Sequence, residues 1–158
     1  MFGVFNDEER AIVSQPEVLS QPFELGFTYT RSTGPVVGRF LTGLKNRQIL
    51  GNKASDGRVI VPPMEYDPDT AEPLGEFVEV GHEGVVVSWC WVKSPRASHA
   101  MAEPFAWAMI KLDGADIPWV QCLKAPSESA VVTGARVRAV WADEPRGYIT
   151  DVQYFELV

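Results

Sequence analysis

The sequence has few cysteines and histidines and no cysteine set that could hold a metal. Only two of each occur among 158 residues. Cys90 and Cys122 lie inside apolar, aromatic segments, so we expect two buried small side chains rather than a redox pair. His82 and His99 fall in predicted loops, which favours solvent-exposed histidines over a general base. We therefore expect no catalytic residue, no metal and no cofactor.

Basic tracts and long apolar runs are also missing. Lys and Arg number 14 against 21 Asp and Glu, a net charge of −7, which disfavours binding to a nucleic-acid backbone. Apolar runs such as residues 84–87 are far shorter than the roughly 20 residues that span a bilayer. The N-terminus lacks the positive and apolar regions of a secretory signal. We expect a cytoplasmic protein without a membrane span.

The N-terminal half contains patterns typical of one well-formed helix and one hairpin. Phe40 and Leu44 share a helical face behind Pro35, which suits the first turn of a helix. Asp-Gly at residues 56–57 is a strong turn signal between two apolar runs. The sequence predicts a polar helix at 6–14, a half-buried strand or extended arm at 23–30, a helix at 35–44, a hairpin at 48–61 and a proline-rich loop at 62–73.

The C-terminal half alternates short apolar segments with turns, as in a small closed barrel. The predicted strands are 77–80, 84–92, 105–112, 117–123, 136–141 and 149–155, with one helical turn at 127–131. Five main strands with a short helix before the last pair predict an OB-type Greek-key barrel. We expect a mainly β protein with an N-terminal helix and ribbon over residues 1–74 and an OB-fold barrel over residues 75–158.

The hairpin and the proline-rich loop have the spacing of a zinc ribbon without its cysteines. Two residues separate Lys53 from Asp56 and Asp67 from Thr70, and ten separate Asp56 from Asp67. Structural zinc needs four thiolate or imidazole ligands, which this set does not provide. We predict a metal-free, rubredoxin-like remnant of a zinc ribbon in which Lys53 pairs with Asp56 or Asp67. A chance spacing in an ordinary loop is the alternative.

Segments along most of the chain carry a family resemblance. They are FLTGL at 40–44, ILG at 49–51, DGRVIVPP at 56–63, EYDP at 65–68, GVVVSW at 84–89, PFAWAMIKLDG at 104–114 and TGARV at 133–137. In order and spacing these resemble the zinc-ribbon and OB-fold proteins associated with acyl-CoA, long known as a domain of unknown function. The loss of all four cysteines resembles a zinc-free branch of that family.

The resemblance implies an accessory role. Members of the family sit beside thiolases, thiolase-like aldolases or hydroxymethylglutaryl-CoA synthase-like enzymes, are not themselves catalytic, and in some cases contact the CoA part of the substrate. The zinc-free relatives resemble the partners of lipid-transfer-protein-type thiolases and of retro-aldolases that shorten steroid side chains as CoA thioesters. The implied function is a non-catalytic subunit that stabilises such an enzyme and covers its CoA channel.

Two sets of residues are candidates for these contacts. Lys93 and Arg96 lie in one predicted loop between strands, where OB folds bind ligands, and their charges suit the phosphates of CoA. The aromatic residues of the barrel are too numerous for its interior, which predicts an outward patch of the kind that marks partner surfaces. The interface candidates are Trp89, Trp91, Phe105 and Trp107.

Two other functions stay open. Aromatic side chains on OB barrels also stack the bases of single-stranded nucleic acid, an alternative that the missing basic groove disfavours. The other alternative is a stand-alone acyl-CoA hydrolase, which is disfavoured because the sequence shows no set of nucleophile, base and oxyanion-stabilising residues.

Overall fold

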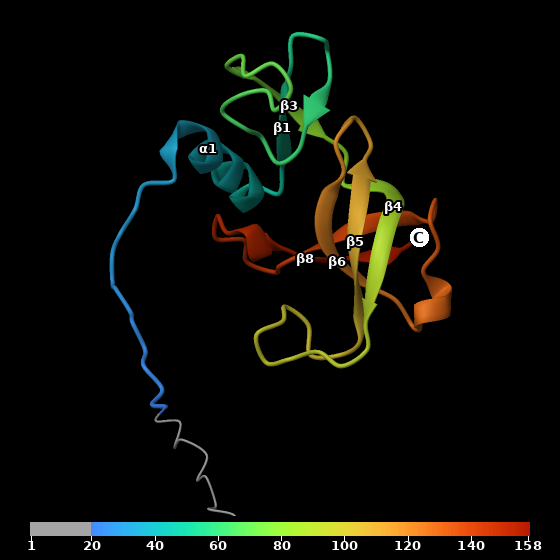
Figure 1. Ribbon diagram of the computed structural model, residues 1–158. Helices are drawn as coiled ribbons and strands as arrows, with labels where there is room; N and C mark the ends of the chain where they lie inside the picture. Colours follow the sequence, from blue (N-terminus) through green and yellow to red (C-terminus); the bar gives the residue numbers. More distant parts are fainter. Residues whose placement is uncertain (1–19) are drawn as a thin grey trace, which may run out of the picture. The chain divides into compact units, whose positions relative to one another are not determined.

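Two β-sheets and one α-helix make up the part of the chain that the computed structural model describes, residues 20–158. A small sheet precedes a closed barrel along the chain (Figure 1). The predicted fold class, mainly β with one helix and a C-terminal OB fold, is confirmed. The elements are α1 (Gly34–Lys45), β1 (Ile49–Lys53), β2 (Val59–Ile60), β3 (Glu76–Val80), β4 (Glu83–Val92), β5 (Phe105–Leu112), β6 (Trp119–Lys124), η1 (Glu128–Ala130), β7 (Arg136–Trp141), η2 (Ile149–Asp151) and β8 (Val152–Leu157).

The small sheet has the strand order β2-β1-β3, and β1 and β2 form the predicted hairpin. Gly57 lies in its turn with a φ of 91°, a left-handed conformation that glycine adopts without strain. β3 pairs with β1 along its whole length, from Ile49 opposite Val80 to Lys53 opposite Glu76. The strand at 77–80 therefore belongs to the small sheet, although its place in the series of predicted strands suggests the barrel.

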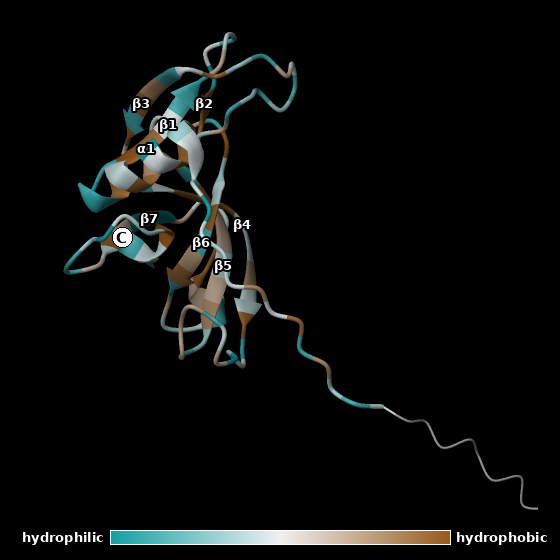
Figure 2. Ribbon diagram, turned by 90° about the vertical axis from the view of Figure 1, so that its left-hand side faces the viewer, coloured by the Kyte–Doolittle hydropathy of each residue, from teal (hydrophilic) through white to brown (hydrophobic). Residues whose placement is uncertain are grey.

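Helix α1 has the predicted position and buries the predicted face. Pro35 lies in its first turn, and Phe40 and Leu44 are buried. Val37, three residues before Phe40, is exposed. The Phe40 ring meets Trp119 of β6 edge-on, with the ring centroids 5.9 Å apart. The helix therefore packs against the barrel as well as beside β1, as Figure 2 shows.

The barrel has the order β4-β5-β6-β8-β7 and closes through the pairing of β7 with β4. β6 and β8 run parallel, and the other pairs are antiparallel. The short helix η1 lies between β6 and β7, where a helical turn is predicted. β8 begins at Val152, after η2, so the last strand starts later than the expected residue 149. This Greek-key arrangement is the OB fold that the strand spacing predicts.

One hydrophobic core joins the helix, the small sheet and the barrel. Leu44 of α1 and Ile49 of β1 belong to the same buried cluster as Phe155 of β8. Asp116, in the turn after β5, adds two hydrogen bonds to Val59 of β2, one from its backbone N–H (2.8 Å) and one to its carboxylate (2.9 Å). Contacts group residues 32–158 into one unit. A boundary at residue 74 would divide two parts that share a core, and it stays a prediction.

Residues 20–33 form neither helix nor strand, and the apolar side chains at 23–30 are exposed, so the half-buried strand is not observed there. The predicted helix at 6–14 lies outside the described residues. Among residues 20–158, no helix combines the length and the apolar character needed to cross a membrane.

Candidate functional site

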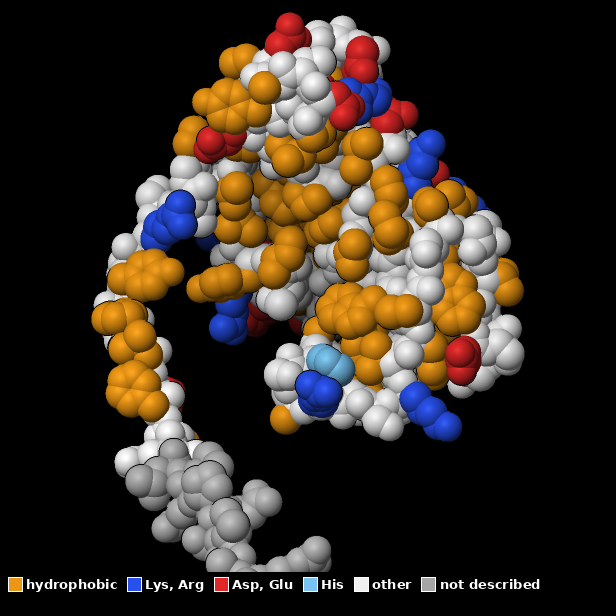
Figure 3. All heavy atoms as spheres, viewed as in Figure 1, with side chains coloured by type: hydrophobic (Ala, Val, Ile, Leu, Met, Phe, Trp, Pro, Cys, Tyr) orange, Lys and Arg blue, Asp and Glu red, His pale blue; other side chains and the backbone are white. Residues whose placement is uncertain are grey.

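Apolar side chains gather on the outside of β4, β5 and β6. Cys90 lies opposite Trp107 across β4 and β5, and Met109 lies opposite Val120 across β5 and β6. Val120 is 53% exposed and Met109 is 40% exposed, and a hollow of about 240 Å³ lies between the side chains. We call Val87, Cys90, Trp107, Met109 and Val120 the outer face; hydrophobic side chains gather over these strands in Figure 3. Such a patch on a barrel surface is typical of a contact site.

A β-bulge decides which tryptophans reach the outer face. The register between β4 and β5 shifts between Val86 and Ser88, so Val87 is an extra residue in β4. Beyond the bulge the inward and outward positions are exchanged. Trp89 and Trp91 are therefore half-buried and pack against the core. Trp89 also lines the hollow on this side of the barrel, so a role for these two side chains in an interface stays a prediction.

Phe105 has no exposed surface and is removed from the interface candidates. Its ring lies 5.3 Å from that of Trp107 and 5.9 Å from that of His99, centroid to centroid. The loop between β4 and β5 is tied by a hydrogen bond from the Arg96 backbone N–H to His99 Nδ1 (3.1 Å). His99 is thus a packing residue, not the solvent-exposed one that the sequence predicts. Of the four predicted interface aromatics, Trp107 belongs to the outer face and Trp89 borders its hollow.

Lys93 and Arg96, the candidates for CoA binding, are exposed in the β4–β5 loop. Neither forms an ion pair with any other residue in the range 20–158. They also do not line the nearby groove, whose two adjoining hollows of about 640 and 740 Å³ share Glu103 and Lys124. Lys124 Nζ lies 5.4 Å from the centre of the Tyr154 ring. The sequence places Lys124 at a strand end but carries no signal that a groove opens there.

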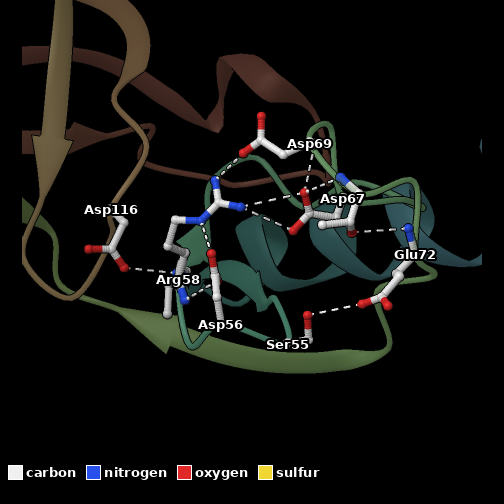
Figure 4. Close-up of polar contacts among 9 residues, drawn as sticks. Ser55, Asp56, Arg58, Asp67, Asp69, Glu72 and Asp116 are labelled. Carbon is white, nitrogen blue, oxygen red and sulfur yellow. Dashed lines mark hydrogen bonds and ion pairs between the residues drawn. The ribbon is translucent and has the colours of Figure 1, made fainter.

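A polar cluster centres on Arg58, just after the hairpin turn (Figure 4). Its guanidinium contacts the carboxylates of Asp56, Asp67 (3.3 Å) and Asp69 (2.8 Å). Asp67 is 3% exposed, and its Oδ1 also accepts hydrogen bonds from the backbone N–H groups of Asp69 (2.8 Å) and Thr70 (3.3 Å). Arg58 therefore cross-links the hairpin to the proline-rich loop.

The four positions of the zinc-ribbon spacing are only partly brought together. Asp56 and Asp67 meet at Arg58, and Thr70 contributes a backbone N–H. Lys53 is exposed and forms no ion pair in the described part of the chain, so the predicted pairing of Lys53 is wrong. Arg58, two residues beyond Asp56, supplies the cation instead. Within residues 20–158 no three His, Cys, Asp or Glu side chains are placed to hold a metal ion, and the absence of zinc stays a prediction.

The two thiols should differ in reactivity. Cys122 is buried as predicted, whereas Cys90 is exposed on the outer face, which corrects the expectation of two buried side chains. Burial raises the pKa of Cys122 to about 11. We expect a thiol reagent at about pH 8 to modify one thiol per folded chain and both thiols in denaturant, because the buried thiol is neither ionised nor accessible. Cys90→Ser should abolish the modification of the folded protein; two equally fast thiols would contradict the burial of Cys122.

Known proteins that resemble this chain carry the same barrel. The profile of the family described as ChsH2, C-terminal OB-fold domain, matches residues 77–142. A protein of unknown function from the DUF35 family of Sulfolobus solfataricus is 21% identical, with a TM-score of 0.57 over 79% of this chain and 85% of that chain. The Ltp2-ChsH2(DUF35) aldolase is 18% identical, with a TM-score of 0.55 over 75% of this chain and 91% of that chain. No curated protein matches the chain. At these identities the structural likeness shows the fold alone.

Proposed function

We propose that the protein is a non-catalytic, cytoplasmic accessory subunit of an enzyme complex that acts on acyl-CoA thioesters. Its partner would be a retro-aldolase or a thiolase-like enzyme of the lipid-transfer-protein type, in the degradation of steroid side chains or other lipids. The observation that carries the proposal is the match of residues 77–142 to the ChsH2 OB-fold domain. The fold shared with the Ltp2-ChsH2(DUF35) aldolase supports the same role.

The outer face supports the proposal as the surface for the partner enzyme. Trp107, Met109 and Val120 expose apolar area at neighbouring positions of two paired strands. Interface centres are typically apolar and aromatic, with charged residues at the rim. Contact with a partner at this face would remove the apolar surface from water, which favours assembly.

The loop next to the outer face supports a contact with CoA. Lys93 and Arg96 carry two charges that are not neutralised by ion pairs within residues 20–158, and phosphate oxygens are strong acceptors for such groups. Lys124 adds a third cation in the groove between this loop and β8. We propose that these side chains hold the phosphates while the partner enzyme holds the acyl group and the catalytic residues.

We also propose that the small sheet and its loops are a zinc ribbon in which Arg58 takes the place of the metal. Lys53, Asp56, Asp67 and Thr70 offer an ammonium, two carboxylates and a hydroxyl, which do not fit a structural zinc. A guanidinium can join several carboxylates at once, because it presents five N–H donors in a fixed plane. Arg58 would thereby hold the two loops together without a metal.

The accessory role is tested by mixing the purified chain with a retro-aldolase or thiolase of the proposed type. We expect the chain alone to turn over no acyl-CoA thioester, and the partner to gain activity or soluble yield severalfold when the chain is added. Bovine serum albumin at the same concentration controls for nonspecific protection. A partner that is equally active and stable alone, or turnover by the isolated chain, would refute the proposal.

A further inference from the structure

The extended segment before α1 presents four large apolar side chains to water. Phe23, Leu25, Phe27 and Tyr29 are between 70% and 84% exposed. They alternate with small or polar residues over positions 23–30, so that an extended chain would place all four on one side. We call residues 23–30 the arm. Four exposed large apolar residues in a row of alternate positions are unusual for a segment that only links two others.

The backbone of the arm is also available for pairing. Residues 20–33 belong to no helix or strand, so their N–H and C=O groups are outside any ladder. The composition of the arm suits a strand, because phenylalanine, tyrosine and threonine all favour extended, paired backbone. Pro22 precedes the arm and Pro35 follows it, so the residues without a backbone N–H lie outside the segment.

We propose that the arm adds as a strand to an open sheet edge of the partner enzyme. An extended peptide recognised in this way gains affinity from its main-chain hydrogen bonds and specificity from pockets for alternate side chains. The complementary surface is a sheet edge of about eight residues flanked by apolar pockets some 7 Å apart, the spacing of alternate side chains in a strand. The inference rests on the proposed function and adds a second contact, separate from the outer face.

Charge favours an enzyme partner over the other possible occupants. A second copy would bring together two chains of net charge −7 each. A membrane surface attracts clusters of basic residues, whereas the arm holds Glu24 and is followed by the single cation Arg31. An alternating segment with one carboxylate and no basic cluster matches the sheet edge of a folded protein best.

The test compares the full chain with a variant in which Phe23, Leu25, Phe27 and Tyr29 are replaced by serine. Affinity for the partner enzyme is measured with both, and we expect the variant to bind about tenfold more weakly or worse, because central apolar anchors dominate such contacts. The matched control replaces Glu24, Thr28 and Thr30 by serine on the other side of the arm and should bind as the unaltered chain does. Residue-resolved hydrogen exchange of the complex should protect alternate amides of residues 23–30, the pattern of an added edge strand.

The outcomes separate the two proposals. If the unaltered chain does not bind the enzyme at all, the proposed function fails and this inference fails with it. If the unaltered chain binds and the serine variant binds equally well, or the arm amides stay unprotected, the inference alone is overturned. Two further results would also overturn it. The unaltered chain could form concentration-dependent dimers in sedimentation, or adsorb to neutral lipid vesicles, and the serine variant could lose that property while its affinity for the enzyme is unchanged.

Discussion

Replacing Asp67 by alanine should lower the free energy of unfolding by about 2–3 kcal/mol, because the donors that now bind its carboxylate would be left without an acceptor. The carboxylate is buried, accepts two backbone N–H groups of its own loop and contacts Arg58. For a chain of this size the expected fall in melting temperature is about 5–10 °C. Thermal and denaturant unfolding of the two proteins measure the effect.

Asp69→Ala is the matched control for this prediction. Asp69 also pairs with Arg58, but its side chain is 67% exposed, so its loss should change stability by less than about 1 kcal/mol. Combining Asp67→Ala with Arg58→Met should cost less than the sum of the single changes, since both remove the contact between Arg58 and Asp67. If Asp67→Ala is as stable as Asp69→Ala, Arg58 is not the cross-link. Stoichiometric zinc in protein purified without chelator would lead to the same conclusion.

The fall in the free energy of unfolding at low pH gives a second test of the Arg58 cluster. Two hydrogen bonds from Arg58 hold the pKa of Asp56 below its ordinary value of 3.8: the larger effect comes from the backbone N–H and the next from the guanidinium. A carboxyl with a lowered pKa in the folded state adds stability that is fully present above 3.8 and is lost as the pH falls through the folded value. Arg58→Met should therefore weaken the loss of stability below about pH 4, an effect that would not follow from a change in packing alone.

Replacing Trp107 by alanine should weaken binding of the partner enzyme about 30-fold or more, the loss of about 2 kcal/mol typical of a tryptophan at the centre of an interface. Trp107 lies between Cys90 and Cys122 in neighbouring strands and beside Met109 on the outer face. A partner at this face would cover its half-buried ring. Affinity measured by interferometry or calorimetry tests the prediction.

Trp107 also packs on Phe105, so a second substitution separates binding from folding. Val120→Lys places a charge on the outer face at a side chain that is 53% exposed, and it should block the partner while leaving the melting temperature nearly unchanged. Val132→Lys, at a valine that is 55% exposed after η1, is the matched control and should bind normally. Equal affinities for the two lysine variants would place the interface elsewhere.

Much of the fold follows from local patterns in the sequence. The helix at 35–44 was predictable because Phe40 and Leu44 recur at helical spacing behind Pro35, and the structure has α1 at Gly34–Lys45. The hairpin turn was predictable because Asp-Gly at residues 56–57 combines a carboxylate that caps the turn with a glycine that takes a positive φ. The order and spacing of the later strands were sufficient to predict the OB barrel. The partner of β3 was not predictable, because strand pairing depends on contacts between distant segments.

The candidate contact surface was predictable only in part. The excess of aromatic residues predicts an outward aromatic patch, but the exposed apolar side chains on these strands are Val87, Met109 and Val120. A period-two count cannot detect the bulge at Val87 that turns Trp89 and Trp91 inward. Phe105 lies on the same side of β5 as Trp107, yet the β4–β5 loop covers it with His99. The exposure of Met109 and Val120 was not visible in the sequence either, since apolar residues in a strand are more often buried.

Helix α1, the hairpin, the OB-type order of the later strands and the lack of a cysteine set for zinc can all be predicted from the sequence, because they depend on residue type and short-range spacing. The cation that holds the loops of the small sheet depends on the folded arrangement: spacing favours Lys53, but only the folded hairpin brings Arg58 against Asp56, Asp67 and Asp69. It also decided which face of the barrel stays apolar and open. Both outcomes depend on side-chain direction, which one extra residue in a strand or one turn of a loop can reverse.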